Sequence, residues 1–128
     1  MDLDAKVQAA NEVLASMRDK DARWWRYSVS HRTFELVVGD PEGNGNIVLC
    51  LSVCDYIAGP VQWPSQRLQV ILDHDRSLKT GSGVFVLQDE MVGFKVQAMT
   101  FLWQKDFNLL KHHSLYFREE GELGSDSN

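Results

Sequence analysis

The chain has 128 residues, of which 44% are hydrophobic and 24% are charged, a composition close to that of an average soluble domain. This length suits one domain, and the apolar fraction can build a core, which argues against disorder of the whole chain. Thirteen Lys and Arg against eighteen Asp and Glu give a net charge of -5, which argues against a nucleic-acid partner. The longest apolar runs are far too short to span a bilayer, so no membrane partner is expected.

The first predicted element is an amphipathic helix over about residues 3–20. Its apolar residues recur at spacings of three and four, the period of a helix with one buried face: Leu3, Val7, Ala10, Leu14 and Met17. Asp2 and Asp4 favour the N-terminus, because carboxylates stabilise the positive end of a helix. The apolar stripe must be covered, most simply by one face of a sheet.

Strands follow, because the apolar period changes from about 3.6 to 2 after Asp21. The alternation of residues 24–31 is out of phase with that of residues 34–38. Either a bulge or bend near residues 31–33, or two separate strands, would explain the change of phase. The Gly- and Asn-rich segment 39–46 is the clearest turn signal, and it predicts a hairpin between strands at 34–38 and 47–53.

The second half of the chain predicts further antiparallel strands. Residues 55–66 carry two of the three prolines and are expected to form a loop, as are residues 74–83. Between these loops, Leu68, Val70 and Leu72 alternate with polar residues as in a half-exposed strand. A second hairpin is expected from segments 84–88 and 92–103, whereas residues 106–117 fit a helix and a strand equally well.

These elements predict an α+β fold in which the N-terminal amphipathic helix packs on a curled antiparallel sheet of five to seven strands. Residues 1–118 are expected to form this single domain. Residues 119–128 read as a disordered acidic tail, because they are rich in Glu, Gly, Ser and Asp.

Two cysteines, Cys50 and Cys54, lie in one predicted strand. At a rise of roughly 3.3 Å per residue their Cα atoms would be about 13 Å apart, too far for a disulfide. Two buried free thiols are therefore expected, and the lack of a basic, apolar leader also favours a cytoplasmic protein. His112 and His113 could complete a zinc site, but an extended segment points adjacent histidines to opposite faces, so no metal site is predicted.

No catalytic residue is assigned. Cys54 beside Asp55 could act as a nucleophile with His31 or His74, yet no glycine-rich turn and no basic neighbour marks this thiol as activated. Asp73 and Asp75 could share a proton, but they lead into a polar loop where solvated ion pairs are the ordinary outcome. We therefore expect a protein without enzymatic activity and without a cofactor.

The aromatic residues carry the strongest functional signal. Trp24 and Trp25 are adjacent, so only one can face the core of a strand, and Trp63 sits in the Pro-flanked loop. An exposed Trp is costly unless it contacts a ligand, a partner or another subunit. Trp24 and Trp63 are therefore predicted to contact a partner, unless the helix and a neighbouring loop cover them.

The leading hypothesis is a non-enzymatic binding or accessory protein that acts through protein–protein contacts. A negative net charge favours a basic partner, as an inhibitor or immunity protein has, and homodimerisation through a sheet edge fits the same facts. The alternative is a small-molecule site or simple enzyme with an apolar pocket between helix and sheet. Its polar groups would be Arg26, His31, Cys54 and Asp55, and an exposed His31 would remove its best residue.

A nucleic-acid accessory remains a third reading only if five basic residues cluster on one face: Arg18, Lys20, Arg23, Arg26 and Arg32.

Overall fold

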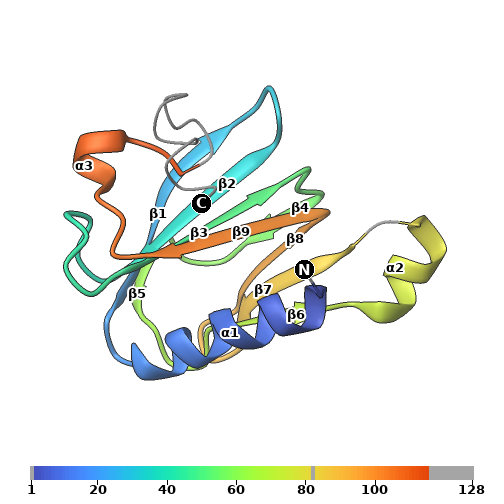
Figure 1. The fold of residues 1–128 in the computed structure, drawn as a ribbon, viewed down its shortest axis with the longest axis horizontal. Helices are drawn as coiled ribbons and strands as arrows, with labels where there is room; N and C mark the ends of the chain where they lie inside the picture. The colour runs from blue at the N-terminus through green and yellow to red at the C-terminus, as the bar shows by residue number, and fades with distance from the viewer. Residues whose placement is uncertain (1, 82, 116–128) are drawn as a thin grey trace.

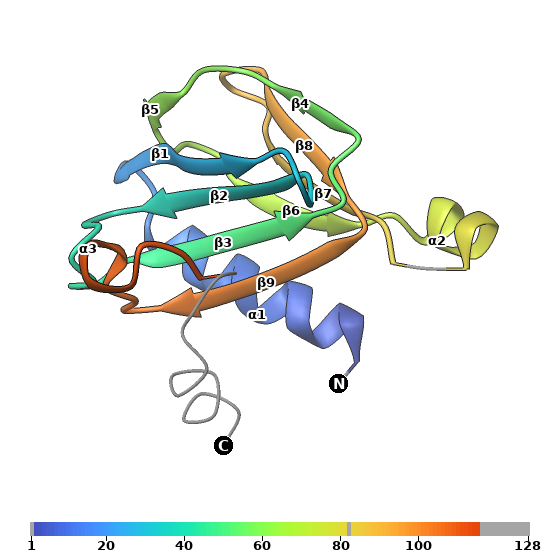
Figure 2. The ribbon, with the colours of Figure 1, turned by 90° about the horizontal axis from the view of Figure 1, so that it is seen from above.

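The computed structural model describes residues 2–81 and 83–115, which form three helices and nine strands in two antiparallel sheets (Figures 1 and 2). One sheet has five strands in the order β5 (Gln62–Pro64), β1 (Asp21–Ser28), β2 (Thr33–Val38), β3 (Ile47–Ser52), β9 (Thr100–Lys105). The other has four, in the order β4 (Tyr56–Ala58), β8 (Phe94–Ala98), β7 (Phe85–Asp89), β6 (Gln69–Leu72). The predicted α+β fold with an N-terminal helix is confirmed. The expected tail at residues 119–128 lies outside the described residues.

The two sheets are joined at one bend. β3 continues into β4, and β8 continues through Met99 into β9, so one pair of strands crosses from sheet to sheet. Met99 N–H donates to the Ser52 carbonyl at 3.1 Å, and Asp55 N–H donates to the Gln97 carbonyl at 3.0 Å. The sequence predicts one strand over residues 92–103. This segment forms two strands, because buried residues alternate with exposed ones up to Ala98 and then continue out of phase at Phe101.

Helix α1 (Leu3–Ser16) covers the inner faces of both sheets (Figure 1). Asp2 caps its N-terminus, as predicted, by accepting a hydrogen bond from Asp4 N–H at 3.1 Å. The helix is shorter than the predicted range of 3–20, because the chain turns at Asp19, whose φ is 74°. Its buried stripe meets side chains from both sheets in the main core, among them Val7, Ala10, Leu14, Met17, Phe34, Leu36, Leu49, Val70, Leu87, Phe94 and Phe101.

Polar side chains of α1 also bind the outer strands β6 and β9. The Asn11 side-chain amide accepts from Val70 N–H at 2.7 Å and donates to the Val70 carbonyl at 2.8 Å. Lys6 Nζ donates to the Phe101 carbonyl, and burial of this amine lowers its pKa. Backbone groups at a sheet edge need partners, and α1 supplies them at both edges.

The pairing of β1 with β2 shows why the apolar alternation changes phase between residues 24–31 and 34–38. Residues 24–38 form two separate strands, and the irregularity lies between Trp24 and Arg26, so Trp25 is bulged. Trp24 therefore packs on the main core, while Trp25 packs on the opposite face of the sheet. The predicted hairpin of β2 and β3 is confirmed, with Phe34 opposite Leu51 and Val38 opposite Ile47.

Every residue of β2 and β3 is buried, because a second layer covers the outer face of their sheet. Phe107, Leu109 and Leu115 pack there against Val37, Val48 and Cys50. Segment 106–115 fits neither a long helix nor a strand, since only α3 (Leu109–His112) is helical. The buried Glu35 carboxylate accepts from Ser114 Oγ and from Leu115 N–H, both at 2.7 Å, and so holds this layer in place.

The expected loop over residues 74–83 contains a helix, α2 (His74–Thr80), so that part of the loop prediction is wrong. The Asp73 side chain caps it by accepting from Arg76 N–H at 3.0 Å, and Gly81 ends it with φ 72°. None of its residues is buried, so the helix leaves no apolar period in the sequence. It projects from one end of the molecule (Figures 1 and 2).

The contact between α1 and β6 predicts a stability effect at Asn11. Asn11→Leu leaves both polar backbone groups of Val70 without their partners, so we expect the free energy of unfolding to fall by about 1–3 kcal/mol. Urea denaturation measures this change. Glu12→Gln, at the neighbouring exposed position, is the control and should change stability by less than about 0.5 kcal/mol. Equal effects of the two substitutions would contradict the edge contact.

Candidate functional site

The candidate residues near the β1–β2 turn come together at one end of the molecule. Val53 N–H donates to the His31 carbonyl at 3.3 Å, and Cys54 N–H donates to the Arg32 carbonyl at 3.0 Å. The turn therefore lies beside the segment that links β3 to β4 (Figure 2). We define the tip surface as six exposed residues at this junction: Arg26, Tyr27, Val29, His31, Arg32 and Asp55.

Apolar side chains are unusually exposed on the tip surface. The exposed fraction of Val29 is 79% and that of Tyr27 is 41%. The backbone beneath them is constrained, since Arg32 and Val53 take positive φ angles of 48° and 57°. This conformation is rare for residues other than glycine, and especially for a β-branched one, so the surrounding hydrogen bonds must maintain it. The tip surface is thus a fixed platform.

Cys54 lies beneath the tip surface and is unsuited to nucleophilic chemistry. Its thiol is buried and donates to the Leu51 carbonyl at 3.4 Å. Burial, with a smaller effect of the Asp55 carboxylate, raises the pKa of Cys54 to about 11. Cys50 is buried in the outer layer. Both thiols are free and buried, as predicted, and no three His, Cys, Asp or Glu side chains converge as a metal site within residues 2–81 and 83–115.

Of the two tryptophans predicted to contact a partner, Trp63 lies in the main core and Trp24 is partly buried against it. Trp63 is only 4% exposed, and its ring centre is 4.4 Å from that of Phe94. Trp24 packs edge-on against Phe34 at 5.0 Å, and its buried indole N–H has no hydrogen-bond partner in the described structure. We therefore place neither indole on the tip surface. Packing in the main core, or against it, accounts for the position of both indoles.

Trp63 is held by a residue that sequence reasoning treated as a turn position. The Asp89 carboxylate is buried and accepts four hydrogen bonds. Its donors are Trp63 Nε1 and Gln66 N–H at 2.9 Å, and the N–H groups of Arg67 and Met91 at 3.2 Å. This one carboxylate therefore connects β5, the 65–67 segment and the β7–β8 turn.

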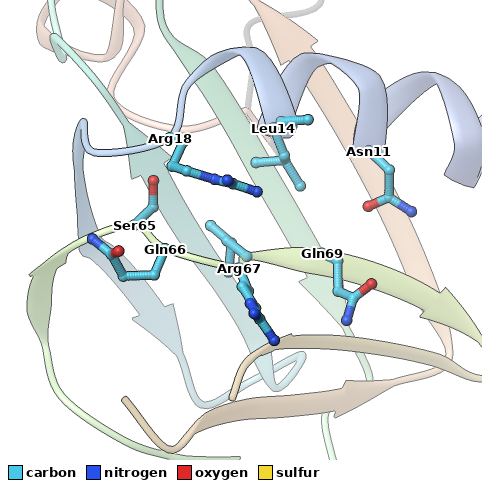
Figure 3. Close-up of a pocket in the computed structure, with 9 residues that line it drawn as sticks. Asn11, Leu14, Arg18, Ser65, Gln66, Arg67 and Gln69 are labelled. Atoms are coloured by element: carbon cyan, nitrogen blue, oxygen red, sulfur yellow. The ribbon is translucent and has the colours of Figure 1, made fainter. Parts of the chain in front are cut away.

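A groove between α1 and segment 65–69 was also missed by sequence reasoning (Figure 3). It measures about 300 Å³, and both Arg18 and Arg67 line it. The only signal that could have found it is the pair of basic residues itself, since their proximity depends on the path of the chain after α1. Arg23 and Arg26 lie on β1 instead, at positions opposite Val37 and Glu35.

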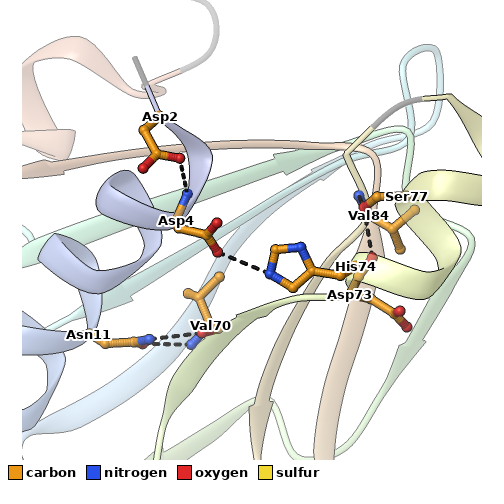
Figure 4. A network of polar contacts seen from close by, with 8 residues as sticks. All are labelled: Asp2, Asp4, Asn11, Val70, Asp73, His74, Ser77 and Val84. Carbon is orange, nitrogen blue, oxygen red and sulfur yellow. Dashed lines mark hydrogen bonds and ion pairs between the residues drawn. The ribbon is translucent and has the colours of Figure 1, made fainter.

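α2 is tied to the body by exposed polar contacts (Figure 4). His74 Nε2 lies 3.1 Å from an Asp4 carboxylate oxygen at the start of α1. Arg76 contacts Asp55 at 3.5 Å and also donates to the Gln97 side chain. The Asp73, His74 and Asp75 triplet thus caps and anchors a helix. Leu78 of α2 is 84% exposed.

The net charge of the chain does not describe the surface of the folded part. Of the eighteen acidic residues, four lie in residues 116–128, and Glu35 and Asp89 are buried. The remaining twelve are matched by twelve Lys and Arg within residues 2–115. The surface of residues 2–81 and 83–115 is therefore balanced in charge, and local groups decide its electrostatics.

In comparisons with known proteins, the chain matches no protein-family model, no curated protein and no solved structure. None of the helices in residues 2–81 and 83–115 is long and apolar enough to cross a membrane.

The hydrogen bonds of Asp89 predict a large effect of an isosteric substitution. Asp89→Asn replaces one acceptor oxygen by a donor facing other donors, so we expect the free energy of unfolding to fall by about 2–4 kcal/mol. Chemical denaturation followed by Trp fluorescence measures the loss. The neighbouring exposed Glu90→Gln is the matched control, and a loss equal to that of the control would disprove the role of Asp89.

The pKa of Cys54 predicts how its alkylation depends on pH. A shift from 9.0 to about 11 means roughly a hundredfold less thiolate at neutral pH than in the unfolded chain. Iodoacetamide should label the native protein slowly at pH 7.5 and the denatured protein twice, as mass spectrometry would show. Because the folded state disfavours the thiolate, the contribution of Cys54 to stability is lost as pH rises from 9.0 to about 11. Rapid single labelling at pH 7.5 would contradict this.

Proposed function

We propose that this protein is a non-enzymatic protein-binding module and that the tip surface is its contact site. The observation that carries the proposal is the exposure of Val29 and Tyr27 on a turn whose backbone is held in place. A large apolar surface left in water contributes little to folding, but its burial against a partner stabilises a complex.

The composition and rigidity of the tip surface support this proposal. Tyr and Arg are enriched at protein interfaces, and the tip surface holds Tyr27, Arg26 and Arg32. A constrained backbone also reduces the entropy that binding would otherwise cost. The hydrogen bonds from Val53 and Cys54 to the turn provide that constraint.

The charges of the tip surface favour an acidic partner surface. Arg26 and Arg32 carry positive charge there. Asp55 is the single carboxylate of the tip surface, and Arg76 lies 3.5 Å from it. This differs from the basic partner expected from the net charge, because that charge belongs to residues 116–128 and to buried carboxylates.

The partner is another protein or a second copy of this chain. A self-complementary contact needs apolar and oppositely charged groups on one patch, and the tip surface holds Val29 with Arg26 and Asp55. Cytoplasmic action is part of the proposal, because two buried free thiols suit a reducing compartment.

The alternative, a small-molecule site built on Arg26, His31, Cys54 and Asp55, has less support. His31 is exposed and Cys54 is buried below the turn, so these side chains do not line one enclosed pocket.

Photo-crosslinking inside the cell tests the proposal. A benzoylphenylalanine residue placed at position 29 should give one discrete crosslinked species, whose mass identifies either another protein or a second copy of the chain. The control is the same residue at position 91, because Met91 is also exposed and lies in the β7–β8 turn, away from the tip surface.

Substitutions then test the contact with the purified partner. Val29→Asp should weaken binding at least tenfold and leave the thermal midpoint within a few degrees, because Val29 is 79% exposed. Met91→Asp should leave binding unchanged. Identical crosslinked species from both positions, or no species from position 29, would overturn the proposal.

A further inference from the structure

The groove of Figure 3 combines two positive charges with an apolar base. α1 contributes Leu14 and Arg18, and the segment after β5 contributes Arg67 and Leu68. Leu14 and Leu68 are buried, whereas both arginines are exposed. A volume of about 300 Å³ is at the lower end of the range for sites that bind small molecules.

The two guanidinium groups are available to a ligand. No carboxylate forms an ion pair with Arg18 or Arg67 in the described part of the chain. The two carboxylates bonded to this segment are already engaged: Asp19 accepts from the Gln66 side chain at 3.2 Å, and Asp89 accepts four hydrogen bonds. Arg18 and Arg67 both carry positive charge and both line the groove, so an anion in the groove is favoured.

Neutral donors surround the same groove. Gln69 lines it from β6 and brings a side-chain amide. Gln66 also lines the groove, but its side-chain amide donates to Asp19 and to the Pro64 carbonyl. Amide N–H groups and guanidinium groups are the donors that bind carboxylate and phosphate oxygens in proteins. Asn11 and Ser65 also line the groove, but their polar groups are bonded to Val70 and to the Met17 carbonyl.

We propose that this groove binds a small organic dianion. Its anionic oxygens contact Arg18 and Arg67, and its short carbon chain lies on Leu14 and Leu68. The oxygens belong either to two carboxylates or to one phosphate monoester, since guanidinium groups bind both with paired hydrogen bonds. This site is separate from the tip surface, so a negative result for one proposal leaves the other unaffected.

NMR titration of the isotope-labelled protein tests the site. The probes are succinate and glycerol 3-phosphate, each compared with sodium chloride at equal ionic strength. We expect saturable shifts of the backbone amides of residues 14–18 and 65–69 with at least one probe. Binding of succinate alone identifies a dicarboxylate site, and binding of glycerol 3-phosphate alone identifies a phosphate site.

Matched variants separate a built site from general attraction to positive charge. Arg18→Gln and Arg67→Gln should each weaken binding at least fivefold, and the double variant should lose less than the product of the two effects, because one ligand contacts both groups. Lys79→Gln removes the same charge from α2 and should leave binding unchanged. An equal loss with Lys79→Gln, or shifts that do not saturate, would show an adventitious ion only and overturn the proposal.

Discussion

The fold depends on how α1 closes an incomplete sheet. The bend at Met99 turns the four-stranded sheet toward the five-stranded one, and β6 and β9 are two of the four outer strands. Unpaired backbone groups there would recruit other strands or bind water beside the core. Asn11 imitates a strand by both donating to and accepting from Val70, and Lys6 binds the Phe101 carbonyl. The helix therefore supplies an apolar stripe and edge partners at the same time. A helix with the same stripe but without these two polar residues would fill the core and leave both edges open.

Buried carboxylates hold separate chain segments together by accepting hydrogen bonds from them. Asp89 gathers donors from three segments around Trp63, and Glu35 holds the outer layer through Ser114 and Leu115. The described hydrogen bonds to both carboxylates come from backbone N–H, indole or hydroxyl groups. These donors have fixed directions, so they specify the position of a loop more closely than a flexible ammonium group would. The groove of Arg18 and Arg67 depends on the segment that Asp89 holds, whereas the tip surface at the other end of β1 is held by backbone hydrogen bonds.

The sequence predicts the parts of this structure that apolar periodicity encodes. The stripe of α1, the alternation of β2 and β6, and the apolar runs of β3 and β7 beside turn signals identify these elements. Periodicity does not reveal α2, because none of its residues is buried, nor the phase change that separates β8 from β9. Of the candidate site residues, His31 and Asp55 lie near the junction of the β1–β2 turn with the β3–β4 segment, and Arg26 lies on β1 opposite Glu35. The sequence predicts a partner contact for Trp24 and Trp63, because a tryptophan next to another one, or in a loop, is expected to be exposed. Trp24 packs edge-on against Phe34, and a distant carboxylate holds Trp63 in the core, and neither contact can be predicted from local spacing.

The position of α1 at the start of the chain has a consequence for biosynthesis. Asn11 precedes Val70 by 59 residues, and Lys6 precedes Phe101 by 95 residues. The helix is thus synthesised before both strands that it binds. At roughly 5–20 residues per second, several seconds separate synthesis of the helix from that of β9. During that interval the nascent chain exposes an apolar helix face and an unfinished sheet. The nascent chain therefore stays prone to aggregation until the strands that α1 binds have been translated and cover these surfaces.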